Sequence, residues 1–186
     1  MMDALTLLTQ RNSEPKLTLP GPDREALHKI IQAGLRAPDH GRLHPWRFIV
    51  IETKARYRLG ELFVEALLLR KPNASEEEIK KAAEAPLRAP LIVAVVAHQV
   101  DHPKVPKIEQ LLSAGCAAHG ILLAAQALGF GAIWRTGDNS YDAHVNAGLE
   151  LTTDELLVGY IYIGTPVGVP KPLATIAMEE FVKIWN

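Results

Sequence analysis

Two short segments of this sequence carry side chains suited to binding a phosphate group. Arg11-Asn12-Ser13 offers a planar guanidinium and a hydroxyl, and Trp134-Arg135-Thr136-Gly137 combines the same chemistry with a flexible glycine. Either segment alone has a simpler explanation, because an arginine at the end of a helix can complement the helix dipole. Two such segments in a nearly neutral chain indicate a small ligand that carries phosphate.

A third polar segment lies between an expected helix and an expected strand. It runs Asp39-His40-Gly41-Arg42-Leu43-His44, and Pro38 and Pro45 on either side restrain its backbone. Binding residues often occupy loops that rigid elements hold in place. The simpler alternative is a loop that ends the helix, in which Asp39 or His40 only caps neighbouring backbone. The residues alone leave both interpretations open.

The seven histidines also raise the hypothesis of a metal site. His98 and His102, with Asp101 between them, have a separation that metal ligands can have. They follow an expected strand and precede Pro103, so helical geometry is doubtful and a solvated loop is favoured. A metal-dependent hydrolase that uses this loop with Asp39, His40 and His44 is kept as an alternative.

Other well-known catalytic patterns do not occur in the sequence. It lacks the G-x-G-x-x-G, G-x-x-x-x-G-K-[ST], G-x-S-x-G and H-E-x-x-H motifs. The single cysteine, Cys116, cannot form an internal disulfide, which favours a reducing compartment. Its neighbours are small and uncharged, so we expect a buried apolar residue and not a nucleophile.

Length and composition predict one globular domain over residues 1–186. The chain is 48% hydrophobic and 22% charged, which is ordinary for a folded protein. Its 20 basic and 21 acidic residues leave a net charge of -1, so no basic patch suggests binding to nucleic acid or to an anionic membrane. The start, Met1 to Leu5, shows no signal peptide, and we expect a cytoplasmic protein.

The stretch from Gly115 to Trp134 is almost free of polar residues and long enough to span a bilayer. It also contains His119, Gln126 and four glycines, and Gly129-Phe130-Gly131 is typical of a helix end. A helix buried on all sides therefore explains it better. A small domain rarely encloses so long an apolar helix, which indicates oligomerisation.

Hydrophobic periodicity and capping residues predict the remaining elements. Asp23 is an expected N-cap, and Ser75 with Glu78 forms an expected capping box. The expected helices span about 3–10, 24–37, 54–69, 76–85, 108–128 and 139–147, and the expected strands span 46–51, 91–97, 131–134 and 156–163. This order favours a mixed α/β or α+β fold with one central sheet. A tail with Phe181, Ile184 and Trp185 needs a surface to pack against.

Several of these segments, taken in order, are similar to a known family. They are Met2 to Leu8, Arg11-Asn12-Ser13, Arg36-Ala37-Pro38-Asp39-His40, Pro45-Trp46, Arg88-Ala89-Pro90-Leu91-Ile92, Ser113 to Ala117, Gly129 to Gly137, and Gly164-Thr165-Pro166. In this combination the chain resembles the small FMN-dependent NAD(P)H nitroreductases of the YdjA type. The resemblance runs from Met2 to about Pro166.

The resemblance implies an α+β fold with a central, mostly antiparallel sheet flanked by helices. It also implies a homodimer that holds FMN in two clefts at the subunit interface, with the long apolar helix in that interface. The tail, about residues 167–186, would pack on its own domain or on the partner subunit.

The resemblance also implies which residues contact FMN. They are Arg11, Asn12, Ser13, Arg36, His40, Trp134, Arg135 and Thr136. Asn12 departs from the family, which has a second arginine there, and Arg36 is expected to reach the cofactor of the other subunit. Arg42 and His44 stand where larger nitroreductases have amide side chains.

The implied activity is hydride transfer from NAD(P)H, through bound FMN, to a small acceptor such as a nitroaromatic or a quinone. The cofactor carries this chemistry, so no catalytic side chain is expected. We expect Arg11 and Arg135 near the phosphate, and His40 or Arg36 as a cation near the ring. A flavin-binding or sensor protein without turnover shares these features and is kept as an alternative to the enzyme.

Overall fold

The computed structural model describes residues 3–169 and 172–186. Met2 of the family-like N-terminal segment and Pro170 of the tail therefore lie outside the described residues. The strands are β1 (Leu17–Thr18), β2 (Trp46–Glu52), β3 (Leu91–His98), β4 (Gly131–Arg135) and β5 (Glu155–Pro166). The α-helices are α1 (Ala4–Gln10), α2 (Arg24–Gly34), α3 (Lys54–Arg70), α4 (Glu76–Glu84), α5 (Lys107–Ala127), α6 (Asp138–Tyr141) and α7 (Ala143–Gly148). Short 3-10 helices are η1 (His40–Arg42), η2 (Ala85–Arg88) and η3 (Met178–Glu180).

The expected caps form as predicted. The carboxylate of Asp23 accepts a hydrogen bond from the amide of Ala26 at 2.8 Å, and Ser75 with Glu78 makes the complete capping box. The helix expected over 139–147 is split into α6 and α7 at Asp142. The side chain of Asp142 caps α7 by accepting from the amides of His144 and Val145.

The strands form one antiparallel sheet in the order β1-β5-β3-β2, and β4 pairs with β5 as well. In the register Val50 lies opposite Val93, Val93 opposite Ile161, and Ile161 opposite Trp134. Strand β3 is buried along almost its whole length, as its continuous apolar sequence predicts. The expected α+β class, with a mostly antiparallel sheet flanked by helices, is confirmed.

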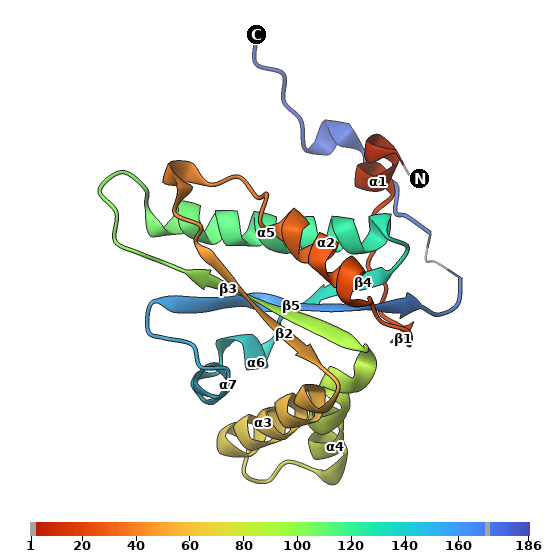
Figure 1. The fold of residues 1–186 in the computed structure, drawn as a ribbon, viewed down its shortest axis with the longest axis vertical. Helices are drawn as coiled ribbons and strands as arrows, with labels where there is room; N and C mark the ends of the chain where they lie inside the picture. The colour runs from red at the N-terminus through yellow and green to blue at the C-terminus, as the bar shows by residue number, and fades with distance from the viewer. Residues whose placement is uncertain (1–2, 170–171) are drawn as a thin grey trace.

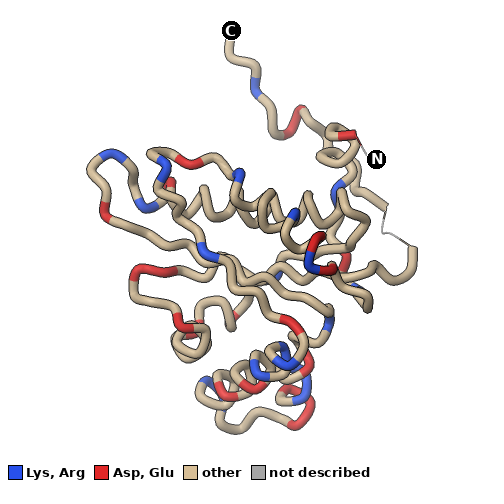
Figure 2. The backbone as a smooth tube through the Cα atoms, viewed as in Figure 1, with Lys and Arg blue, Asp and Glu red and all other residues tan. Residues whose placement is uncertain are grey.

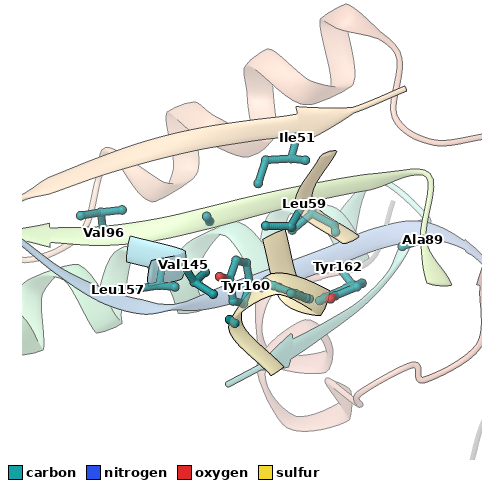
Figure 3. Close-up of a cluster of buried hydrophobic side chains, with 12 residues drawn as sticks. Ile51, Leu59, Ala89, Val96, Val145, Leu157, Tyr160 and Tyr162 are labelled. Carbon is teal, nitrogen blue, oxygen red and sulfur yellow. The ribbon is translucent and has the colours of Figure 1, made fainter. Parts of the chain in front are cut away.

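Helices cover both faces of this sheet (Figure 1). Alternate strand residues such as Val93 and Ile161 face α2 and α5, and their neighbours such as Ala94 and Tyr160 face α3 and α7. Figure 3 shows the second of these clusters, where Tyr160 and Tyr162 of β5 lie near Leu59 and Val145. Strand β4 pairs only with β5 among the described strands, so it lies at an edge of the sheet.

Helix α5 is covered on one side only, so the expectation of a helix buried on all sides is wrong for the single chain. Its outer side exposes Ile108 (59%), Leu112 (61%), Cys116 and His119, a stripe at helical spacing. The expectation that Cys116 is buried is wrong for the same reason, since α2 and the sheet cover only the opposite side. By length and composition α5 alone among the described helices could cross a membrane, but it packs as a core helix of this domain.

The tail leaves the domain beyond β5 (Figure 1). Its described side chains, residues 167–169 and 172–186, are all exposed, including Phe181 and Ile184, and Trp185 is 96% exposed. The described tail therefore covers little of its own domain.

Candidate cofactor site

The segment that follows α1 is held against the first residues of β4. The amide of Glu14 donates to the carbonyl of Ala132 at 3.0 Å. The approach depends on Gly131, because a Cβ there would lie 3.0 Å from the Cβ of Glu14 and 2.8 Å from a methyl of Leu17. Arg11 and Asn12 then line a cavity of about 160 Å³, together with residues at the end of α5.

Asn12 and Ser13 interact within this segment. The side-chain oxygen of Asn12 accepts a hydrogen bond from the amide of Ser13 at 2.9 Å. Asn12 thus engages a backbone donor that an arginine at this position would leave available for an anion. The departure from the family arginine changes the local hydrogen bonding as well as the charge.

Trp134 and Arg135 point to opposite faces of the sheet. Trp134 packs on the α5 side, and its indole nitrogen donates to the carbonyl of Val158 at 3.2 Å. Gly159 makes room for it, since a Cβ there would lie 2.3 Å from the indole nitrogen and the φ angle of 149° also disfavours other residues. Among the described residues, no strand pairs with the outer edge of β4, so the backbone around Trp134 to Thr136 can bind a ligand.

Arg135 extends to the other side, over the ring of Tyr162, with 5.7 Å between the guanidinium carbon and the ring centroid. Its Nε atom is buried and has no hydrogen-bond partner in the part of the chain that the structure describes. Arg135 and Thr136 line a second cavity of about 390 Å³, which also contains Tyr160 and Tyr162. Burial raises the pKa of Tyr162 to about 12 and raises that of Tyr160 as well, so both phenols stay protonated at neutral pH.

The two arginines expected near one phosphate therefore line different cavities. Arg11 lies by the start of β4, while Arg135 lies at its end and faces α3 and α4. The structure does not bring the two guanidinium groups together within one cavity.

His40 lies in the loop after α2, beside the N-terminal part of α5. Its Nδ1 atom is 2.6 Å from a carboxylate oxygen of Glu109. Asp39 caps this loop by accepting from the amides of Leu43 at 3.1 Å and His44 at 2.8 Å. Asp39 therefore caps backbone amides, as the simpler alternative expected. The ring of His40, in contrast, contacts α5 and does not cap the end of α2.

The buried amide of Gln110 stabilises the segment on which this loop rests. Only 1% of Gln110 is exposed, and it bonds to the amide of Val100 and to the carbonyls of Val100 and Val105. Val105 in turn is close to Gly41, whose φ angle of 77° permits the tight turn at η1. Arg36 lies nearer α2, in a shallow depression with Gln32 and Ala33.

The expected contact residues are thus distributed along α5. His40 contacts Glu109 near the start of the helix, and Arg11 lines a cavity with Gln126 near its end. Seventeen residues separate those positions, which corresponds to about 25 Å along a helix axis. His40 and Arg11 of one chain therefore lie near opposite ends of α5 and do not line a common cavity.

The histidines proposed as metal ligands have other contacts. His98 lies 3.6 Å from a carboxylate oxygen of Glu155, and Nδ1 of His102 accepts from the amides of Lys104 and Val105. Within residues 3–169 and 172–186, no three His, Cys, Asp or Glu side chains are grouped as a metal site would require. The geometry therefore gives no support to the metal-dependent hydrolase.

Three residues at these sites were not predicted from the sequence. Lys81 and Arg88 line the cavity of Arg135, and Glu109 contacts His40. The sequence alone does not predict these contacts. Arg88 and Arg135 are far apart in the chain, and they line one cavity only because the helices pack under the sheet.

Comparisons with known proteins identify the family of this chain. Residues 8–165 match the model of the nitroreductase family. The chain is 40% identical over 178 residues to the Escherichia coli protein named "Putative NAD(P)H nitroreductase YdjA", covering 92% of this chain and 96% of that one. It is 42% identical over 166 residues to a Haemophilus influenzae protein named "Putative NAD(P)H nitroreductase", covering 88% and 89% of the two chains.

Solved structures have the same fold at low sequence identity. A nitroreductase-like protein from Bacillus cereus superposes with a TM-score of 0.84 at 20% identity, over 99% of this chain and 96% of that one. A Bacteroides fragilis nitroreductase with bound FMN gives a TM-score of 0.73 at 19% identity, over the full length of both chains. With its family match over residues 8–165 and relatives of similar length, this chain belongs to the nitroreductase family.

Proposed function

We propose that this protein is an FMN-dependent oxidoreductase that transfers hydride from NAD(P)H to a small acceptor such as a nitroaromatic or a quinone. The observation that carries the proposal is the 40% identity, over 92% of the chain, to a relative named for NAD(P)H nitroreductase activity. The cavity beside Arg11 and the unpaired edge of β4 are compatible with it.

The residues present fit FMN. Arg11 lines a cavity at the start of β4, and its guanidinium together with the hydroxyl of the nearby Ser13 suits the phosphate. The unpaired edge around Trp134 to Thr136 offers backbone groups to the carbonyls and nitrogens of a flat ring. The buried, unpartnered Nε of Arg135 is a donor that a ring carbonyl would satisfy. We therefore assign Arg11 to the phosphate and Arg135 to the ring.

We further propose a homodimer with two such sites at its interface. The exposed apolar stripe of α5 suits contact with the same stripe of a second copy. If two α5 helices pack antiparallel about a twofold axis, the start of one helix lies beside the end of the other. His40 and Arg36 of the partner subunit would then approach the cavity of Arg11, which a single chain cannot achieve.

Bound FMN would supply the redox chemistry, accepting a hydride from NAD(P)H and passing it to the acceptor. The chain holds the cofactor, keeps Arg135 beside the ring and places the imidazole of His40 of the partner subunit at the cleft. A cation near the ring favours the negative charge that builds up on reduction. NAD(P)H and the acceptor would use the same open side in turn.

Two further expectations belong to this proposal. The tail packs on the partner subunit, because Phe181, Ile184 and Trp185 are exposed on their own chain. The protein works in the cytoplasm, where its single cysteine stays reduced.

A spectrum of the purified protein, before and after heat release of the cofactor, tests the proposal. We expect a flavin spectrum, a released compound that matches FMN, and oxidation of NADH or NADPH when a quinone or nitroaromatic is added. Bound flavin without turnover would favour the flavin-binding or sensor protein. A colourless protein that does not take up FMN and holds a metal would favour the hydrolase.

A further inference from the structure

The cavity of about 390 Å³ beneath β4 and β5 has an unbalanced set of charges. Lys81 of α4, Arg88 at the end of η2 and Arg135 of β4 all line it. Within the described part of the chain, none of the three forms an ion pair or a hydrogen bond. The other lining cation, Arg70, is paired with Asp142 and Asn139.

The acidic residues of the cavity do not neutralise these cations. Glu78 is bound to Lys71, and this contact lowers its pKa to about 2. Asp138 is the other lining carboxylate, and it has no ion pair to a described residue. With Arg135 assigned to the flavin ring, the two remaining cations, Lys81 and Arg88, face one available carboxylate and leave a net positive cavity, although the protein as a whole is nearly neutral. Figure 2 shows how the charges gather around α3 and α4, while the sheet above is mostly uncharged.

The cavity also contains hydrogen-bond donors without partners. The hydroxyl of Tyr160 and the Nε atom of Arg135 are buried and have no hydrogen-bond partner among the described residues. Because Arg135 Nε is assigned to the flavin ring, the phenol of Tyr160 is the donor left for a second ligand. A buried donor left without a partner costs free energy, so such groups usually meet a ligand or an ordered water. Arg135 and Tyr160 lie opposite each other in the pairing of β4 with β5, so both donors are next to the strand that carries the proposed flavin edge.

The rest of the wall is apolar and aromatic. Its residues are Phe63 and Leu67 of α3, Ala82 of α4, Ala85 of η2 and Tyr160 of β5. Phe63 and Tyr160 meet edge to face, with ring centroids 5.6 Å apart. A volume of this size is within the range of ligand pockets, which are mostly apolar with a few directed polar groups.

We propose that this cavity is a subsite for the anionic end of an aromatic acceptor, so that the enzyme favours aromatic carboxylates over their neutral analogues. Lys81 and Arg88 bind the carboxylate, and the aromatic wall contacts the ring that bears it. The reducible group then lies toward the edge of β4, where the flavin is proposed to bind. The assignment rests on the proposed function, because the acceptor is defined by it.

The test compares para-nitrobenzoate with para-nitrobenzamide, which has nearly the same shape but no charge. Calorimetry on the FMN-loaded protein gives the affinity for each probe, and steady-state kinetics with NAD(P)H gives kcat/KM for each. The variants are Lys81→Gln and Arg88→Gln. Lys80→Gln is the matched control, because Lys80 lies next to Lys81 on α4 but does not line the cavity.

We expect the wild type to bind para-nitrobenzoate at least tenfold more tightly than the amide. Lys81→Gln should reduce this preference about threefold and Arg88→Gln about tenfold, because a guanidinium can form two parallel hydrogen bonds to a carboxylate, whereas an ammonium acts as a point charge. Lys80→Gln should keep the wild-type preference. The same ratios should appear in kcat/KM.

Equal affinity for the two probes in the wild type would overturn the assignment. So would para-nitrobenzoate that displaces FMN, because the cavity would then belong to the cofactor. Turnover with a neutral quinone reports separately on the proposed function. If that turnover is absent while the probe preference persists, the proposed function fails and the cavity remains an aromatic-anion site.

Discussion

At the scale of single residues, the structure separates two arginines that sequence patterns treat alike. Arg11 and Arg135 each combine a guanidinium with a nearby hydroxyl, but they line different cavities at opposite ends of a short strand. The sequence identifies both as ligand-binding candidates. It cannot tell which part of the ligand each one meets, because that depends on the alternation of side chains along β4 and on the packing of α4.

The different roles of these arginines predict different losses of affinity. Arg11→Ala should weaken FMN binding about tenfold to a hundredfold and leave riboflavin, which lacks the phosphate, almost unaffected. Arg135→Ala should weaken both ligands by similar factors, since it acts on the ring. Fluorescence titrations of both flavins measure this, with the exposed Arg24→Ala as control. Equal losses of FMN and riboflavin in Arg11→Ala would remove Arg11 from the phosphate.

His40 is predicted to act on the flavin of the partner subunit. His40→Ala should slow reduction of bound flavin by NAD(P)H if the contact strengthens as the ring gains charge, and should weaken only FMN binding if it does not. Glu109→Gln should produce a smaller effect in the same direction, because Glu109 orients the imidazole at 2.6 Å. Stopped-flow reduction and FMN titration measure both. Wild-type rates together with wild-type affinity in His40→Ala would mean that His40 has no role at the cofactor.

At the scale of elements, periodicity and caps predict most helices and strands correctly. The alternation of Val93 and Ala94 between two helical layers and the capping box at Ser75 are local signals, so they can be read without the fold. Strand β1 was missed, because its two residues have no periodicity and form a strand only by pairing with Thr165 and Pro166. Cys116, expected to be buried, is exposed on the single chain, because the cover of α5 depends on elements distant in sequence.

The start of β5 predicts a specific loss of stability in acid. The Glu155 side chain is nearly buried, bonds to Arg47 of β2 at 2.6 Å and to the amide of Thr152, and these contacts lower its pKa below 4.5. A carboxyl whose folded pKa is depressed stabilises the fold at higher pH, and this stability is lost as pH falls from about 4.5 through the folded pKa.

Glu155→Gln should therefore reduce the free energy of unfolding at pH 7 by about 1–2 kcal/mol. The loss stays in this range because Arg47 is partly exposed and water screens its charge. Below pH 4 the difference between variant and wild type should shrink. Urea unfolding at several pH values measures this. A deficit that stays constant from pH 7 to pH 3 would contradict the role of the ionised carboxylate.

At the scale of the whole molecule, one side of α5 and the tail remain uncovered. An apolar stripe and three large exposed side chains near one terminus are more than a monomer normally leaves in water. The same arrangement explains why the flavin-binding residues are divided between the two ends of α5. The proposed homodimer accounts for both, with an interface above ~2,000 Å² as expected for an obligate dimer.

Leu112→Lys should disrupt that dimer, because it places a charge in the centre of the apolar stripe. We expect sedimentation velocity to show a monomer or an unfolded chain, and FMN retention to fall with it. Leu69→Lys, at an equally exposed position on α3, is the control and should remain dimeric with bound FMN. A folded wild-type monomer that holds FMN at micromolar concentration would contradict the composite site.

The most direct test of the central claim is an anaerobic titration of the FMN-loaded protein with NADH and with NADPH. The account predicts loss of the flavin absorbance with one equivalent of at least one of them per bound FMN. It also predicts full recovery of that absorbance when a quinone or nitroaromatic is added without oxygen. Flavin that stays oxidised with both nucleotides, or reduced flavin that no such acceptor reoxidises, would contradict the assignment of this protein as an FMN-dependent oxidoreductase.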